Sequence, residues 1–264
     1  FALFFAEKRP FFLEGVDLFS TPFSAVYTRT VTSPRAGLRA TGRVGSTSYT
    51  ALVAQDRGDG LVILPGPQGS DAALQDFVSD VGVARVRRDL GLSFVSVLAT
   101  TREIRGGGFN RVFGPDFQWR PRATDSFTGQ FLWSETHTPV RPDLAAQWDG
   151  RHLSDGAGLL SWSHSTRHED WYLQAQSLGA NFRADNGFIP QVGYREVALD
   201  AGYTLHPKDA FFNRIRIFTP NYYDAEPDGD VLSRRVSVGA GMDGGFNSFL
   251  RFEAGQDGIR VGNE

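Results

Sequence analysis

The chain has 264 residues, a formal charge of −3 at pH 7 and no cysteine. A disulfide scaffold is therefore excluded, and nucleic-acid binding is disfavoured because proteins of that class are usually basic. The chain is 41% hydrophobic and 13% aromatic, which argues against disorder, yet no apolar run approaches the roughly 18 residues of a transmembrane helix. It starts at Phe1 without a signal-peptide pattern, and we expect it to be a segment cut from a longer protein.

The first element in chain order is rich in Phe and lacks the period of two that marks a strand. Its charges stand between apolar pairs, and Pro10 removes a backbone donor that a central strand would need. We predict that residues 1–26 form a plug or brace inside a barrel, and that Arg9 pairs with Glu7, Glu14 or the wall residue Asp116, because an unpaired buried charge is costly. A linker that merely seals the periplasmic end is the alternative. The candidate plug or brace residues are Glu7, Lys8, Arg9, Pro10, Phe11, Phe12, Glu14 and Gly15. The Phe side chains, with Phe4, Phe5 and Phe19 among them, should pack on small residues of the inner wall.

From residue 27 to residue 264, apolar and polar residues alternate with the strand period. The predicted strands of roughly 8 to 13 residues exceed the usual globular length of about 5 to 6 and match the roughly 9 to 11 needed to cross a membrane. The sequence therefore predicts an all-β fold, namely an antiparallel up-and-down transmembrane β-barrel or a large segment of one, with about thirteen strands. We expect this barrel region to be incomplete at its C-terminal end.

Two predicted strands allow the faces to be assigned. Val197, Leu199, Ala201 and Tyr203, together with Ile215 and Ile217, should face lipid. Charged residues at mid-strand should face the lumen, where polar side chains are normal. The lumen-facing candidates are Asp116, Glu196, Asp200, Arg214, Arg216 and Arg251.

The predicted connections alternate largely between short and long, as in outer-membrane barrels. Residues 45–46, 89–91, 123–126, 154–156, 207–209 and 244–245 are expected tight turns, and residues 57–76, 103–114, 137–144, 179–190 and 220–231 are expected longer loops. The alternation slips near residues 167–170, where a short connection replaces an expected long one. Aromatic residues also gather towards strand ends, where a membrane interface favours them.

Several segments carry a resemblance to a known family. Residues 7–15 read EKRPFFLEG, residues 27–29 read YTR, residues 110–116 read NRVFGPD, and Asn181-Phe182 precedes Gly187-Phe188-Ile189-Pro190. These resemble motifs of the bacterial family called domain of unknown function 5916, although Gln191 stands where that pattern expects a basic residue nearby. The resemblance implies an outer-membrane β-barrel in a Gram-negative bacterium, with a module similar to carbohydrate-binding family 9 upstream of Phe1. It implies little about chemistry.

Motifs for catalysis or metal binding are weak. Residues 239–244 match G-x-G-x-x-G but lie in a predicted strand rather than before a helix, as a dinucleotide site would require. His164 and His168 would be about 13 Å apart in a strand, too far for one zinc ion. The acidic stretches 56–60 and 224–230 lack calcium-loop spacing. We predict no catalytic residues, no metal and no cofactor.

The leading interpretation is a non-enzymatic outer-membrane barrel that acts as a channel, receptor or anchor for an upstream glycan-binding module. Its expected partners are outer-membrane lipid and lipopolysaccharide, with an oligo- or polysaccharide as a further ligand, no nucleic acid, and a protein partner of unknown identity. One alternative is a soluble or surface-exposed all-β enzyme or binding domain that acts on glycans. The other is a barrel that serves as a scaffold for secretion or surface assembly.

Overall fold

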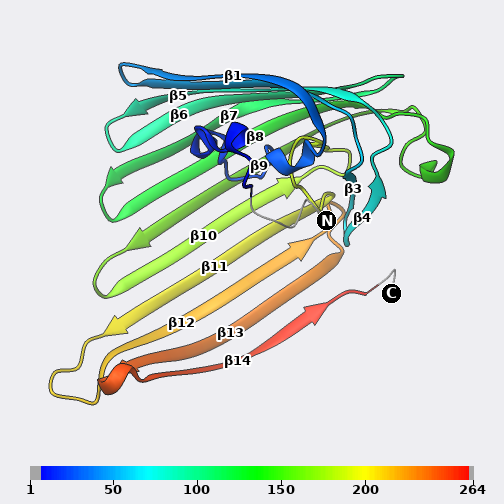
Figure 1. Cartoon of the computed structure of the whole chain (residues 1–264). Helices are drawn as coiled ribbons and strands as arrows, with labels where there is room; N and C mark the ends of the chain where they lie inside the picture. The colour runs from blue at the N-terminus through cyan, green and yellow to red at the C-terminus, as the bar shows by residue number, and fades with distance from the viewer. Residues whose placement is uncertain (1–6, 262–264) are drawn as a thin grey trace. The chain divides into compact units, whose positions relative to one another are not determined.

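The computed structural model describes residues 7–261. In this part of the chain the fold is all-β and antiparallel, as the sequence predicts (Figure 1). Twelve strands form one sheet in the order β1-β2-β5-β6-β7-β8-β9-β10-β11-β12-β13-β14, and β3 pairs with β4 in a separate hairpin. The described chain thus has fourteen strands rather than about thirteen, and β1 and β14 are the edges of the large sheet.

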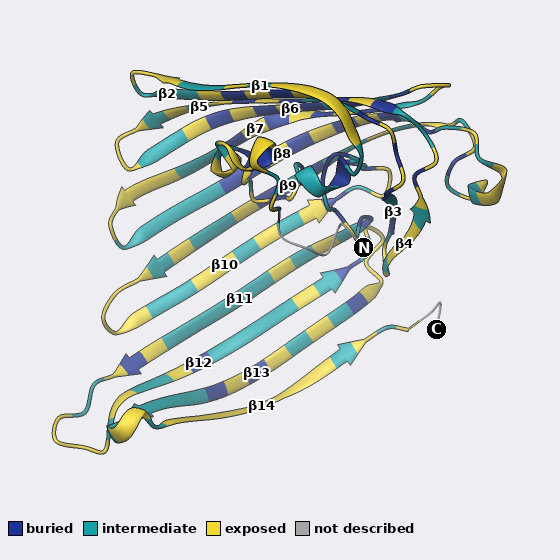
Figure 2. Cartoon of the chain, viewed as in Figure 1, coloured by how far each residue is buried: buried dark blue, intermediate teal, exposed yellow. Residues whose placement is uncertain are grey.

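The strands are long. Their bounds are Pro34–Val44 (β1), Thr47–Asp56 (β2), Leu61–Gly66 (β3), Gly69–Leu74 (β4), Ser79–Leu90 (β5), Ser93–Ile104 (β6), Phe109–Arg122 (β7), Asp125–His137 (β8), His152–Ser165 (β9), Glu169–Leu178 (β10), Tyr194–Leu205 (β11), Phe212–Ala225 (β12), Val231–Gly244 (β13) and Phe249–Ile259 (β14). Buried and exposed residues alternate along most of them, as Figure 2 shows. This alternation is the structural form of the period of two in the sequence.

Helical structure in the described residues is confined to short turns. These are α1 (Pro10–Leu13) and the 3-10 turns Val16–Phe19, Thr28–Thr30, Pro142–Leu144 and Gly245–Asn247. No helix within residues 7–261 has the length and apolar character needed to cross a membrane.

The chain divides into two compact units. The first comprises Phe1–Gln118, Gly129–Leu159 and Leu178–Gly193, and the second comprises Trp119–Thr128, Leu160–Ser177 and Tyr194–Glu264. Each unit therefore takes segments that are distant in sequence.

The pattern of connections corrects three predictions. Residues 154–156 lie inside β9 rather than in a turn, while β7 begins at Phe109 and β12 continues to Ala225, so the loops after β6 and β12 are short. All three long connections, residues 57–78, 138–151 and 179–193, follow even-numbered strands and lie at one end of their strands. The turn at residues 166–168 follows β9, an odd-numbered strand, and the connections after odd-numbered strands of the large sheet are all short. A short connection is therefore regular at this position, and the alternation of short and long connections does not slip there.

The N-terminal segment, defined here as residues 7–33, contains no strand. Proline at the first position of α1 fixes the backbone there, and Gly15 adopts a left-handed conformation with φ 56° between the two helical turns. The segment lies against one face of the strands of the first unit (Figure 1). The expectation for Phe4 and Phe5 falls outside the described residues.

Candidate functional site

The candidate site is the polar face of the first unit, which two segments cover. One is the N-terminal segment, and the other is the return loop, defined as residues 179–193. They bind each other through the backbone: the amide of Phe188 donates to the carbonyl of Ser24, and the amide of Tyr27 donates to the carbonyl of Asn186, both at 2.7 Å. The two segments therefore form one layer over the strands.

Residues of the EKRPFFLEG motif bind one another and other residues of the N-terminal segment. The Glu7 carboxylate accepts hydrogen bonds from the Arg9 guanidinium at 2.7 and 2.9 Å and from the Thr28 hydroxyl at 2.8 Å. Arg9 also donates to the carbonyl oxygens of Val31 and Thr28, at 2.6 and 2.9 Å. The prediction that Arg9 pairs with a carboxylate is confirmed, and the partner is Glu7.

The pKa of Glu7 reflects these contacts. Burial alone would raise it, but the hydrogen bonds from Arg9 and Thr28 outweigh burial and lower the pKa to about 2. Arg29, whose guanidinium lies 3.9 Å from the carboxylate, adds positive charge nearby. Glu7 is therefore an anion at neutral pH.

Phe11 and Phe12, the two adjacent aromatic residues of the motif, contact different parts of the first unit. Phe12 is buried under the Arg9 guanidinium, which lies 4.2 Å from the ring centroid. The Phe11 ring packs on Gly37 of β1, where a Cβ atom would lie only 2.9 Å from the ring. This contact confirms, for Phe11, the expected packing on small wall residues. Lys8, Glu14 and Gly15 stay at the surface or half-buried.

Asp116, a predicted lumen-facing residue, is buried beneath this layer. It forms an ion pair with Arg85 of β5, and both side chains are almost inaccessible to solvent. Arg85 also donates to the carbonyl oxygens of Leu18 and Ser20, at 2.7 and 2.9 Å. The strand wall is thereby joined to the N-terminal segment by a charged side chain that sequence reasoning missed.

A second missed arginine joins three segments. Arg102 of β6 is fully buried and donates to the Thr30 carbonyl and the Asn186 side chain, each at 3.0 Å. Its guanidinium lies 3.8 Å from the carboxylate of Asp56 on β2. Asp56 in turn accepts hydrogen bonds from the Gln75 side chain at 3.0 Å and from a backbone amide of the N-terminal segment. Arg102 therefore holds the N-terminal segment, the return loop and β2 together.

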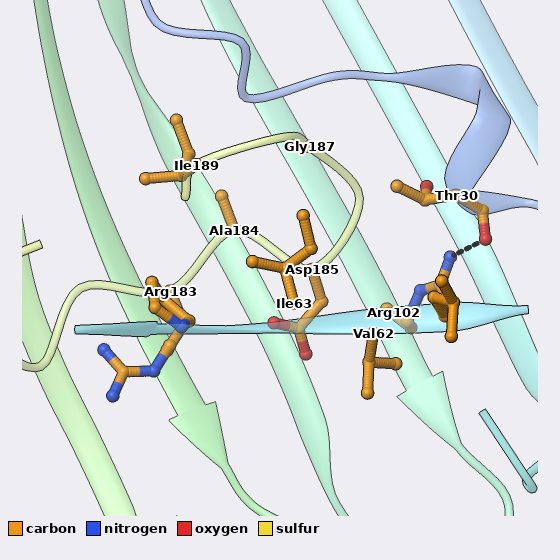
Figure 3. A pocket seen from close by; sticks show the side chains of 11 residues that line it. Thr30, Val62, Ile63, Arg102, Arg183, Ala184, Asp185, Gly187 and Ile189 are labelled. Carbon is orange, nitrogen blue, oxygen red and sulfur yellow. Dashed lines mark hydrogen bonds between the residues drawn. The ribbon is translucent and has the colours of Figure 1, made fainter. Parts of the chain in front are cut away.

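A small cavity lies beside Arg102 (Figure 3). Its volume is about 20 Å³, which suits a single water molecule. Asp185 stands between Arg183 and Arg102 on its wall. Burial raises the pKa of Asp185, and the two arginines oppose that shift. The cavity is too small for a metabolite, and residues 7–261 contain no cluster of three or more potential metal ligands.

In the second unit, the predicted lumen-facing charges have partners on neighbouring strands or, for Arg251, on the same strand. Arg216 binds Asp170 at 3.0 Å and also Asp200, Arg214 binds Asp243 at 2.7 Å, and Arg251 binds Glu253 at 2.8 Å. Glu196 accepts from Gln174 and Gln176, at 2.9 and 3.1 Å. These contacts form a ladder of charged and polar side chains, in which Glu196 of β11 also lies directly opposite Asp224 of β12.

The register of β11 and β12 places the predicted residues on opposite faces. Tyr203 lies opposite Ile217 and Leu205 lies opposite Ile215, whereas Arg216 lies opposite Thr204. Directly opposed residues share a face of the sheet, so the apolar set and the charged set separate as predicted.

The polar face has an apolar counterpart in each unit. In the first unit, Val86, Val97 and Phe113 are each about half exposed, and in the second unit Val197 and Ile217 are similarly exposed. Monomeric soluble proteins rarely expose large contiguous apolar surfaces.

Aromatic clusters occur at the ends of the strands. In the second unit, Trp119, Phe127, Trp162 and Trp171 form a chain with ring centroids 5.0 to 5.4 Å apart. Trp171 also stacks on His164, which bonds to Asp125 at 2.8 Å. In the first unit, Phe109, His137 and His152 form a second cluster, with the two histidines stacked at 4.2 Å.

Two weaker motifs have structural explanations. Residues 239–244 lie in strand β13, and Gly239 makes room for Phe218 of β12. The ring nitrogen of His168 bonds to the carbonyl of Thr204 at 2.9 Å, so His164 and His168 have different partners.

A scan against protein-family models and searches of curated proteins and of solved structures found no match to this chain. The resemblance to domain of unknown function 5916 therefore stays a prediction from the motifs.

Proposed function

We propose that this chain forms part of the membrane-spanning wall of an outer-membrane β-barrel, and that it acts as an anchor or receptor rather than an open channel. The observation that carries the proposal is the separation of each unit into a polar, ion-paired face and an exposed apolar face. A barrel in lipid needs this arrangement, since every second residue contacts hydrocarbon and the others face the interior.

The height of the apolar face fits a bilayer. On β5 the apolar face carries Asp80, then Gly82, Ala84 and Val86, and then Arg88. The eight residue steps between the two charged positions span about 27 Å along the strand at roughly 3.4 Å per residue. With a tilt of about 35 to 45°, this gives a band of roughly 20 Å, close to the approximately 25 Å of known barrels.

The aromatic clusters support the same arrangement. Trp and His rings with polar atoms suit the region where hydrocarbon meets water. Trp162 donates to the Asp125 carboxylate at 3.1 Å and stacks on Phe127, so one cluster presents both polar and apolar groups. Clusters at strand ends match the aromatic girdles that flank the apolar band of outer-membrane barrels.

The covered interior favours an anchor or receptor over a channel. In the first unit, the N-terminal segment and the return loop bury Arg85, Arg102, Asn110 and Asp116, which are the side chains that would otherwise line a water-filled passage. A link to glycan binding and lipopolysaccharide rests on the motif resemblance and on the proposed location. A soluble glycan-active enzyme is the second candidate, but the apolar faces disfavour it.

The absence of cysteine permits a direct test. Single cysteines at Val197, on the apolar face, and at its neighbour Ala198, on the polar face, would each carry a nitroxide spin label in protein reconstituted into liposomes. Val86→Cys and Arg87→Cys provide a second pair in the other unit. We expect oxygen, which partitions into lipid, to collide more often with the labels at Val86 and Val197. A protein that stays soluble without detergent, or equal accessibility within both pairs, would reject the proposal.

A further inference from the structure

The apolar face of the first unit contains a groove. Two adjoining hollows, wide open to the surface and of about 580 and 520 Å³, share Val53, Gly82, Thr101 and Glu103 as lining residues. Each volume lies within the range of small-molecule binding sites. The groove follows β5 and is bordered by β1, β2, β6 and β7.

Side-chain size explains the groove. Ala84 on β5 lies directly opposite Ala51 on β2 and Ala99 on β6, so the floor is low across three strands. Leu38 on β1 and Phe113 on β7 stand at the sides and are 71% and 53% exposed. An apolar chain lying on this floor would bury these side chains as well as its own methylene groups, which is favourable.

One end of the groove carries two exposed ion pairs. Arg105 lies 3.3 Å from Asp80, and Arg111 lies 2.8 Å from Glu103. All four side chains are between 43% and 55% exposed. These ion pairs lie where the apolar band of the first unit meets polar residues. A lipid head group at the membrane surface could therefore contact both positive and negative side chains there.

We infer that this groove binds one acyl chain of a phosphatidylethanolamine molecule, with the head group at the two ion pairs. This inference rests on the proposed function, since it requires the apolar face to lie in a bilayer. The phosphate accepts hydrogen bonds from Arg105 and Arg111, whose guanidinium groups match its geometry. The primary ammonium donates to Asp80 and Glu103. The quaternary ammonium of phosphatidylcholine has no N–H donor, and phosphatidylglycerol has no ammonium.

The test uses the full chain purified in detergent and mixed with equal amounts of phosphatidylethanolamine, phosphatidylcholine and phosphatidylglycerol. Native mass spectrometry then records which lipid the protein retains. Ala84→Leu fills the floor of the groove, and Ala201→Leu makes the same change on the apolar face of the second unit. We expect preferential retention of phosphatidylethanolamine by the unaltered chain and by Ala201→Leu. Ala84→Leu should reduce retention at least about tenfold, because several methylene groups lose their contacts.

A double variant, Arg105→Gln with Arg111→Gln, tests the head group. It should abolish the preference among the three lipids while leaving some retention. Equal retention by Ala84→Leu and Ala201→Leu would overturn the inference, as would a change of oligomeric state in Ala84→Leu without loss of lipid, which would indicate an interface between copies.

Flotation with liposomes separates the two proposals. If the unaltered chain does not float with liposomes, the proposed function fails and the groove inference fails with it. If all variants float equally and retain lipid equally, only the groove is rejected.

Discussion

Arg85 of β5 and Asp116 of β7 form an ion pair that the N-terminal segment covers. The exposed fractions of their side chains are 2% and 1%. Because Arg85 also binds backbone carbonyls of Leu18 and Ser20, one guanidinium joins two strands to the covering layer. The pair therefore connects β5, β7 and the N-terminal segment of the first unit.

Asp116→Ala should lower the free energy of unfolding by about 3 to 5 kcal/mol, since it leaves the Arg85 charge buried and unpaired. Denaturant unfolding in lipid vesicles measures this quantity. Asp89→Ala is the matched control, because Asp89 pairs with Arg43 and Arg87 near the surface and its loss should cost about 1 kcal/mol or less. Similar losses for the two variants would show that the buried pair contributes little.

The Glu7 carboxylate should make the N-terminal segment sensitive to acid. Its folded pKa of about 2 lies below the ordinary value of 4.5. A lowered pKa stabilises the folded state above the ordinary value, and this contribution is lost as pH falls from about 4.5 towards 2. The protection of residues 7–33 against hydrogen exchange, relative to the intrinsic exchange rate at each pH, should therefore fall across this interval.

Glu7→Gln should remove most of that pH dependence, and Glu14→Gln should leave it intact, because Glu14 is exposed. An unchanged pH profile in Glu7→Gln would assign the acid sensitivity to other carboxylates.

Leu199→Arg places a charge on the apolar face of β11, midway between Val197 and Ala201. In a bilayer it should lower the free energy of unfolding by about 2 to 4 kcal/mol. Ala198→Arg puts the same side chain on the polar face beside Asp200 and should cost much less. If both variants have the stability of the unaltered chain in lipid vesicles, the apolar face does not lie in the membrane.

Deleting residues 1–19 should raise single-channel conductance in planar bilayers. The deletion removes α1 and the carbonyl of Leu18 that Arg85 contacts, and it opens part of the polar face to water. Removing residues 1–6 alone, which leaves the Glu7–Arg9 pair, is the control. A correctly folded deletion variant with unchanged conductance would reject the plug and favour a linker.

The sequence was informative where a pattern is local. The period of two predicts the strands and the opposite faces of Leu199 and Asp200, and a short motif predicts the pairing of Arg9. It was less informative for Arg85 and Arg102, because their partners come from distant segments and no spacing along the chain connects them. Gly156 resembles a turn residue beside Asp155, yet it lies inside β9, where its place is set by pairing with neighbouring strands that the local sequence does not show.

The hydrogen bonds between Ser24 and Phe188, and between Tyr27 and Asn186, have a consequence for biogenesis. Ser24 and Tyr27 obtain these partners only after the chain has been made through β10 and the return loop. Such late closure of contacts between distant residues slows folding. The layer over the polar face of the first unit is therefore complete only after the return loop has been made.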